Sequence, residues 1–163
     1  MTVVGFDPGL NRTGYAIIKD TTPVSVLTHG VIIAHPNQPL NQRFALIFSS
    51  AQKILQDYRP EVVTVEEVYF ANNPQTTLKI GIVRGLLFAA ALEQKIDVVS
   101  FSPAEVKMAV SGKGNATKEQ VQYLTAAILG LKENIPEDSA DALALCLCYL
   151  SHLKYQKRLQ DAK

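Results

Sequence analysis

The sequence is poor in sulfur and has no tryptophan. Its 163 residues include two cysteines and two methionines. Two cysteines cannot make a disulfide framework, and Cys146 and Cys148 lie two positions apart, so on a helix they point in different directions. We therefore interpret both as core thiols rather than as a disulfide pair or a metal pair.

Long apolar runs are also missing. The densest stretch, residues 81–92, is interrupted by Arg84, and no run approaches the roughly 18 residues of a membrane-spanning helix. The first residues, MTVVGFDPG, lack a basic region followed by a long apolar one, so a signal peptide is not expected. We expect a soluble, cytoplasmic protein without a membrane partner.

An excess of charge of one sign is absent too, since 16 basic residues balance 15 acidic ones, for a net charge of +1. This balance argues mildly against a nucleic-acid-binding protein, which often has a pI above about 9. The distribution is uneven, however, with four acids between residues 133 and 141 and clusters of lysines elsewhere. A nearly neutral net charge is compatible with an acidic pocket that has a basic rim. Charged residues spread over a solvated surface would give the same numbers of acidic and basic residues.

Hydrophobic periodicity, turn residues and capping signals define ten elements. Short apolar or β-branched runs predict strands at residues 3–6, 14–19, 25–33, 62–65 and 98–101. Helical spacing and capping residues predict helices at 40–58, 74–94, 103–110, 117–129 and 138–155. We expect residues 1–163 to form one domain, with residues 156–163 as a flexible basic tail.

The order of these elements predicts an α/β fold. Three consecutive strands with short turns favour an antiparallel meander, and the later strand–helix–strand units require parallel strands. The result is a five-stranded mixed sheet flanked by helices. Sites in such sheets form beyond the carboxyl ends of strands.

Four carboxylates are placed where such a site would form. Asp7 and Glu66 each end a predicted strand, and Asp138 and Asp141 share one face of the last helix. Converging carboxylates repel unless a cation neutralises them, and oxygen ligands without histidine or cysteine suit Mg²⁺ or Mn²⁺. Each acid can also be explained singly as a turn, cap or solvated residue. Asp141 fits that explanation least, because its helix is otherwise apolar.

These residues lie in segments that resemble one known family. Similarity to the RuvC-type Holliday junction resolvases, members of the RNase H-like nuclease superfamily, covers nearly the whole chain in register. It is carried by residues 5–9 (GFDPG), 13–15 (TGY), 65–69 (VEEVY), Gly85, 106–107 (VK) and 138–144 (DSADALA).

The resemblance implies an RNase H-like fold and an enzyme that nicks two opposed strands of a four-way DNA junction, leaving 5′-phosphate ends. It implies that Asp7, Glu66, Asp138 and Asp141 are catalytic and hold Mg²⁺, with two ions per site and Mn²⁺ as a substitute. It also implies a homodimer that acts in recombination and repair with the branch-migration motor RuvAB.

Three further residues match DNA-contacting positions of the family. Lys107 and Lys118 match basic residues near its site, with expected roles in phosphate contact and charge stabilisation. Tyr69 matches a base-contacting aromatic, and aromatic side chains stack on unpaired bases. A solvated helix position for Lys118 and a core position for Tyr69 remain open alternatives.

Other functions compete with this interpretation. An actin-like or sugar-kinase ATPase also has a strand followed by Asp, Gly and Thr, but it needs a second domain to close over ATP. A YqgF-like RNase H-fold nuclease acting on RNA or junctions, and a catalytically silent junction-binding module, are the remaining alternatives. The apolar helix at 74–94 favours a homodimer interface.

Overall fold

The computed structural model describes residues 1–67, 73–131 and 135–161. Its strands are β1 (Thr2–Asp7), β2 (Arg12–Lys19), β3 (Ser25–Ile33), β4 (Val62–Glu66) and β5 (Asp97–Phe101). Its helices are α1 (Leu40–Tyr58), α2 (Pro74–Glu93), α3 (Pro103–Ser111), α4 (Lys118–Leu129) and α5 (Glu137–Asp161).

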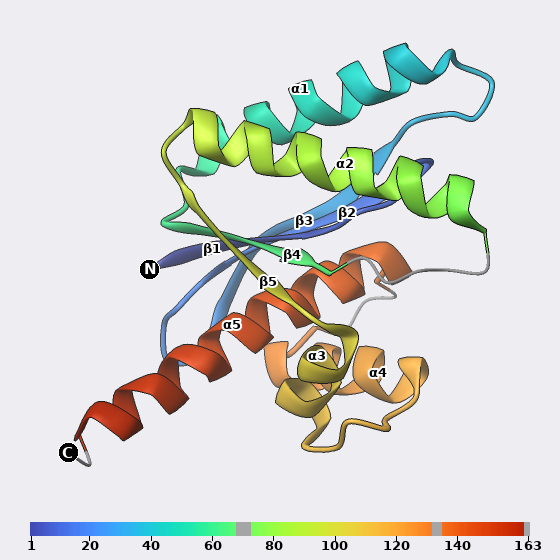
Figure 1. The fold of residues 1–163 in the computed structure, drawn as a ribbon. Helices are drawn as coiled ribbons and strands as arrows, with labels where there is room; N and C mark the ends of the chain where they lie inside the picture. The colour runs from blue at the N-terminus through green and yellow to red at the C-terminus, as the bar shows by residue number, and fades with distance from the viewer. Residues whose placement is uncertain (68–72, 132–134, 162–163) are drawn as a thin grey trace.

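The five strands form one sheet in the order β3-β2-β1-β4-β5 (Figure 1). β1, β2 and β3 pair antiparallel, whereas β4 pairs parallel to β1 and β5 pairs parallel to β4. The five-stranded mixed sheet expected from the order of elements is confirmed. Parallel pairing matters for the site, because it brings the carboxyl ends of β1 and β4 to the same edge.

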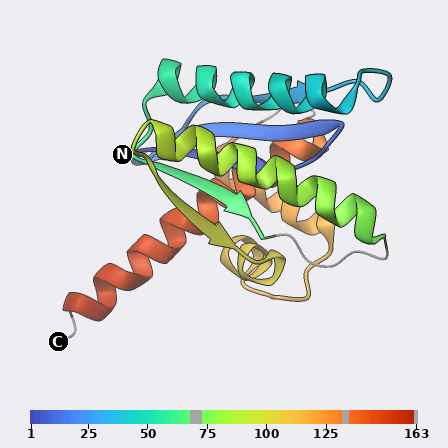
Figure 2. The ribbon, with the colours of Figure 1, turned by 45° about the horizontal axis from the view of Figure 1, so that its top comes forward.

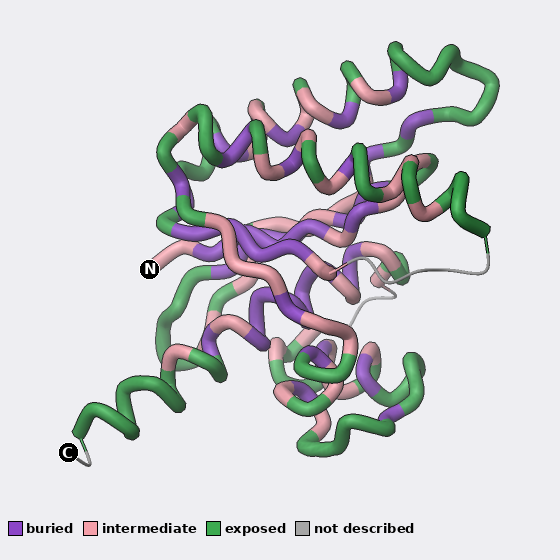
Figure 3. Tube along the Cα trace, viewed as in Figure 1, coloured by how far each residue is buried: buried purple, intermediate pink, exposed green. Residues whose placement is uncertain are grey.

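Helices cover both faces of the sheet, with α1 and α2 on one face and α5 on the other (Figures 1 and 2). Because side chains alternate along a strand, Val4 and Phe6 of β1 pack toward α1 and α2, whereas Val3 packs toward α5. The buried residues accordingly follow the sheet and the first half of α5 (Figure 3). The same alternation turns Asp7 toward α5.

A glycine lets α5 lie close against β1. A Cβ atom at Gly5 would lie 2.3 Å from the carbonyl oxygen of Ala142 and 2.8 Å from Cys146 Sγ, so a larger residue would push the helix away. Cys146 and Cys148 are both buried free thiols, as predicted. The close packing fixes the height of α5 above the sheet, and with it the position of the acids on its first turns.

α3 and α4 pack on α5 beyond the end of β5 and form a core of their own with it (Figure 1). Both helices begin at a capping box, in which Ser102 pairs with Glu105 and Thr117 pairs with Gln120. The second capping box fixes where α4 starts, at Lys118.

The expected end of the last helix, at residue 155, was wrong. α5 continues to Asp161 (Figures 1 and 2). Residues 156–161, which were expected to belong to a flexible tail, are therefore helical. The last buried side chain of α5 is that of Leu150, so the apolar pattern stops before the helix does. No proline or glycine follows to break it.

α2 is more apolar than the sequence reasoning allowed. By length and composition alone it could cross a membrane, although only 22% of its most apolar window is buried. Val83, Leu87, Ala90 and Ala91 pack on the sheet, and Arg84 donates to Ser100 Oγ at 2.7 Å. The opposite face exposes Leu78, Ile82 and Leu92. α2 is thus a sheet-packing helix with a second apolar face that no described residue covers.

Candidate active site

Asp7 and Glu66 end neighbouring parallel strands. In the β1–β4 register Phe6 lies beside Val65, so the two acids come next on each strand. Both acids are partly buried at the carboxyl ends of their strands. Val3, Val62 and Thr64 come earlier on the same two strands and lie on the same face of the sheet, the one that α5 covers. The structure therefore brings together the two acids that the sequence placed at strand ends.

A third acid reaches the same place from α5. A cavity of about 280 Å³ is lined by Asp7, Glu66 and Asp141, with Lys107 of α3 and Lys118 of α4 on its wall. Its remaining lining is mostly apolar: Pro103, Val106, Val121 and Ala144. The structure therefore contains an acidic pocket with a basic rim, which the nearly neutral net charge of the chain does not reveal.

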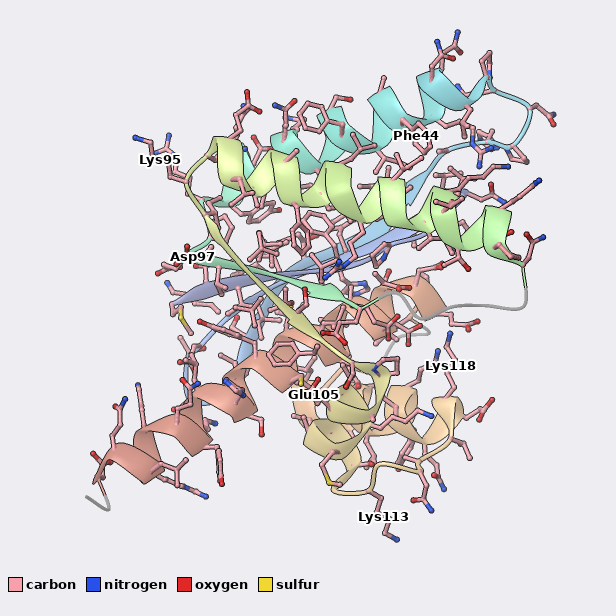
Figure 4. The ribbon with its side chains drawn as sticks, in the orientation of Figure 1. Phe44, Lys95, Asp97, Glu105, Lys113 and Lys118 are labelled. Carbon is pink, nitrogen blue, oxygen red and sulfur yellow. The ribbon has the colours of Figure 1, made fainter. Side chains whose placement is uncertain are left out.

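Lys118 bridges two acids of α5. Its Nζ lies 2.9 Å from Asp141 Oδ2 and 2.5 Å from Glu137 Oε1. Figure 4 shows the Lys118 side chain reaching from α4 toward the first turn of α5, whereas Lys113 points away from the body. Lys118 is therefore not simply a solvated helix residue, because its ammonium group is directed at the pocket.

Asp138 lies one turn before Asp141 but does not line the cavity. Its Oδ2 accepts from Arg12 Nε at 2.7 Å, across 126 residues of sequence. Sequence reasoning missed Arg12, although its position between the matching segments 5–9 and 13–15 was an available signal. It also left Glu137 out of the site, although that residue stands in the acidic run.

The acids are electrostatically coupled. Burial, together with the charges of Glu66, Asp141 and Asp138, raises the pKa of Asp7 to about 7. Burial also raises the pKa of Glu66 and of Asp141, each further raised by a neighbouring carboxylate. Partial burial lowers the pKa of Lys118, but its hydrogen bonds to Glu137 and Asp141 outweigh this and raise it overall. The pocket thus concentrates negative charge that a cation would relieve.

The donor set fits a hard divalent cation, because three carboxylates face one cavity without histidine or cysteine. Within the described residues, no three potential ligand side chains already lie close enough to share one ion. Two of the four acids are instead held by basic side chains, Asp138 by Arg12 and Asp141 by Lys118. Binding of an ion would exchange those partners for the metal.

The remaining predicted DNA contact, Tyr69, lies outside the described residues. The nearest described residue on the far side is Asn73, whose side chain caps α2 by accepting from the backbone of Gln75 and Thr76. The proposed role of Tyr69 therefore stays a prediction.

Fold and pocket together define the class: an RNase H-like α/β enzyme with carboxylates at the carboxyl ends of β1 and β4. The family model described as "Crossover junction endodeoxyribonuclease RuvC" matches residues 3–149. The chain belongs to this RuvC family of crossover junction endodeoxyribonucleases, and it is a DNA-cleaving hydrolase.

Two curated relatives illustrate the similarity. The RuvC of Dictyoglomus thermophilum is 40% identical over 152 residues, which cover 92% of this chain and 96% of the relative. The RuvC of Pelodictyon phaeoclathratiforme is 41% identical over 153 residues, covering 92% of this chain and 80% of the relative. The similarity therefore covers the site residues at both ends of the chain, from Asp7 of β1 to Asp141 of α5.

Solved structures agree with the fold. Thermus thermophilus RuvC superposes with a TM-score of 0.87 at 32% identity, over 96% of this chain and 97% of that one. The same relative in complex with a Holliday junction substrate gives 0.89 at 33% identity, covering 96% of each chain. A yeast mitochondrial Holliday junction resolvase, 16% identical with a TM-score of 0.68 over 91% of this chain and 77% of that one, shares the fold alone.

Proposed function

We propose that this protein resolves four-way DNA junctions by nicking two opposed strands, leaving 5′-phosphate ends, in homologous recombination and repair. The observation that carries the proposal is the meeting of Asp7, Glu66 and Asp141 in one cavity whose wall holds Lys107 and Lys118. A Thermus relative of known structure is described with a Holliday junction substrate, which supports the same substrate here.

Asp7, Glu66, Asp138 and Asp141 are the proposed metal ligands, with Mg²⁺ as the physiological ion, two ions per site, and Mn²⁺ as a substitute. A bound divalent cation supplies a water of lowered pKa and stabilises the negative charge that develops on the phosphate. Asp7 is a full ligand for a cation only when its carboxyl is ionised, and in the metal-free protein burial and the neighbouring carboxylates raise its pKa to about 7.

Lys107 and Lys118 are the proposed phosphate contacts. Both stand on the wall of the acidic cavity, so a DNA backbone that enters it meets positive charge beside the carboxylates. Their ammonium groups orient the phosphate and offset charge on its oxygens. Tyr69, which follows β4 in the sequence, is proposed to stack on an unpaired base at the junction centre.

A homodimer is proposed through the exposed face of α2. Of the apolar residues of α2, Val83, Leu87, Ala90 and Ala91 pack in the core. The surplus lies on the opposite face, where Leu78 is 69% and Ile82 47% exposed.

Gly81 and Gly85 on that face have no neighbouring atom within 4 Å of an added Cβ, so a second helix can approach closely. Two copies would present two active sites to the two strands.

Family membership supports two further assignments. We propose cooperation with a RuvAB branch-migration complex and action in the cytoplasm, where chromosomal junctions of a bacterial cell form.

One assay separates this function from its rivals. The protein with Mg²⁺ is incubated with a synthetic four-way junction, a duplex of the same arms and an RNA–DNA hybrid. Paired nicks in the junction alone are expected. Equal cutting of RNA substrates would favour the YqgF-like alternative, and binding without cutting would favour a silent junction-binding module.

A further inference from the structure

Asp138 is held differently from the other three acids. Asp7, Glu66 and Asp141 line the cavity, whereas Asp138 does not, and its Oδ2 is bound to Arg12 Nε at 2.7 Å. The carboxylate of Asp138 therefore faces Arg12 rather than the pocket.

The backbone that carries Arg12 is anchored on several sides. Thr13 Oγ1 donates to the carbonyl of Gly9 at 2.8 Å, and the Ala34 amide donates to the carbonyl of Asn11 at 2.9 Å. The buried Arg43 donates to the carbonyl of Leu10 at 3.0 Å and to the side chain of Asn11. The guanidinium of Arg12 thus extends from a fixed turn toward a fixed first turn of α5.

Lys118 offers a contrast. It bonds both Glu137 and Asp141, so it keeps one acidic partner when Asp141 turns to a metal ion. In the described part of the chain, Asp138 is the one acid bonded to Arg12. If Asp138 Oδ2 turns to a cation, the Arg12 pair is lost, and the guanidinium left nearby repels the incoming ion.

From this geometry we infer that Arg12 is a positioning residue that competes with the divalent cation for Asp138. The inference rests on the proposed metal site, and it adds that the site is incomplete until Asp138 leaves Arg12. Arg12 thereby weakens binding of the ion that Asp138 ligates and holds the DNA-free enzyme in a metal-poor state. Its side chain is half exposed, so removal should leave the core intact.

The test is a calorimetric titration of Mn²⁺ into the DNA-free protein at pH 8 and low salt. Four proteins are compared: the parent, Arg12→Gln, Asp138→Asn and the double variant. Arg12→Gln should bind Mn²⁺ about fivefold more tightly, the scale of one exposed ion pair. In the Asp138→Asn background the same change should alter the affinity by less than about twofold. Thermal melts check that each variant folds.

Lys113→Gln is the matched control, because it removes one positive charge from a side chain that points away from the pocket (Figure 4). Its Mn²⁺ affinity should equal that of the parent. An unchanged or weaker affinity in Arg12→Gln overturns the inference and leaves the metal site standing. Equal tightening with and without Asp138 also overturns it, since Arg12 would then act only through its charge. Absence of saturable Mn²⁺ binding in both the parent and Arg12→Gln overturns the metal site itself.

Discussion

A Cβ atom added at Gly14 would lie 1.9 Å from the carbonyl oxygen of Asp138. Gly14 stands opposite Asp7 in the β1–β2 register, so this near contact joins the second strand to the first turn of α5 beside the first acid. The bare glycine therefore sets how closely the acids of α5 approach the acid of β1.

Gly14→Ala should disturb this approach. The methyl group meets backbone atoms, which cannot rotate away, so α5 must shift; the expected loss is about 1–3 kcal/mol of stability, with a marked loss of junction cutting. Thermal melts and cleavage rates check this. Gly114→Ala is the control, because its Cβ would meet only Met108 at 3.8 Å. Equal behaviour of the two variants would contradict the packing role of Gly14.

The elevated pKa of Asp7 predicts how stability depends on pH without metal. Folded Asp7 holds its proton up to about pH 7, whereas the unfolded residue loses it near 3.8. The protonated carboxyl therefore stabilises the fold at low pH, and this contribution, at most about 4 kcal/mol, is lost as pH rises from about 4 through 7.

Melts of the parent and Asp7→Asn in a chelator, from pH 5 to pH 8, test this. The advantage of the asparagine variant should grow with pH, because it never acquires the buried charge. A difference in melting temperature that stays constant over this range would show that Asp7 titrates normally.

Lys107→Ala should slow junction cutting by about tenfold or more, because one donor to the developing phosphate charge is removed. Binding should weaken only slightly, with a salt dependence lower by about one phosphate contact. Lys113→Ala, on the exposed loop after α3, should change neither. Cleavage rates and gel-shift affinities at several salt concentrations distinguish the two lysines. Parallel losses in both variants would mean that overall charge, not position, matters.

Ile82→Glu should convert the proposed homodimer into a monomer, because a carboxylate would be buried in the apolar face of α2. Sedimentation at micromolar concentration measures this. Tyr123→Glu, at a side chain 74% exposed on α4, is the control and should leave the dimer intact. A parent protein that sediments as a monomer, or an unaffected Ile82→Glu dimer, would contradict the interface.

Much of the fold and part of the site follow from local patterns. Turn residues, capping residues and apolar periodicity together indicate the strands and helices, and parallel pairing of the first and fourth strands is enough to bring Asp7 beside Glu66. Helical spacing alone puts Asp138 and Asp141 on one face. These features depend on near neighbours or on the topology rules of sheets.

The remaining features depend on distant packing. The Arg12–Asp138 pair joins residues 126 positions apart, and the absence of a side chain at Gly14 leaves room for the first turn of α5 to lie against β2. Similarly, nothing in the sequence of α2 says which apolar residues face the sheet and which face outward. The end of α5 was misjudged for a different reason: the apolar pattern stops near Leu150, but residues 151–161 contain no proline or glycine that would stop the helix there.

The central claim is that the acids of this pocket act through a bound metal and not through DNA binding or folding. The most direct measurement compares junction cutting and gel-shift affinity side by side for Asp7→Asn, Glu66→Gln and Asp141→Asn in Mg²⁺. Each change removes a negative oxygen with little change in volume. The prediction is a loss of cutting of about 100-fold or more, because metal-bound charge stabilisation is worth several kcal/mol, with junction affinity equal to or tighter than the parent's. Retained cutting by Asp7→Asn or Glu66→Gln would contradict the metal assignment, and lost binding would show that these acids shape the fold instead.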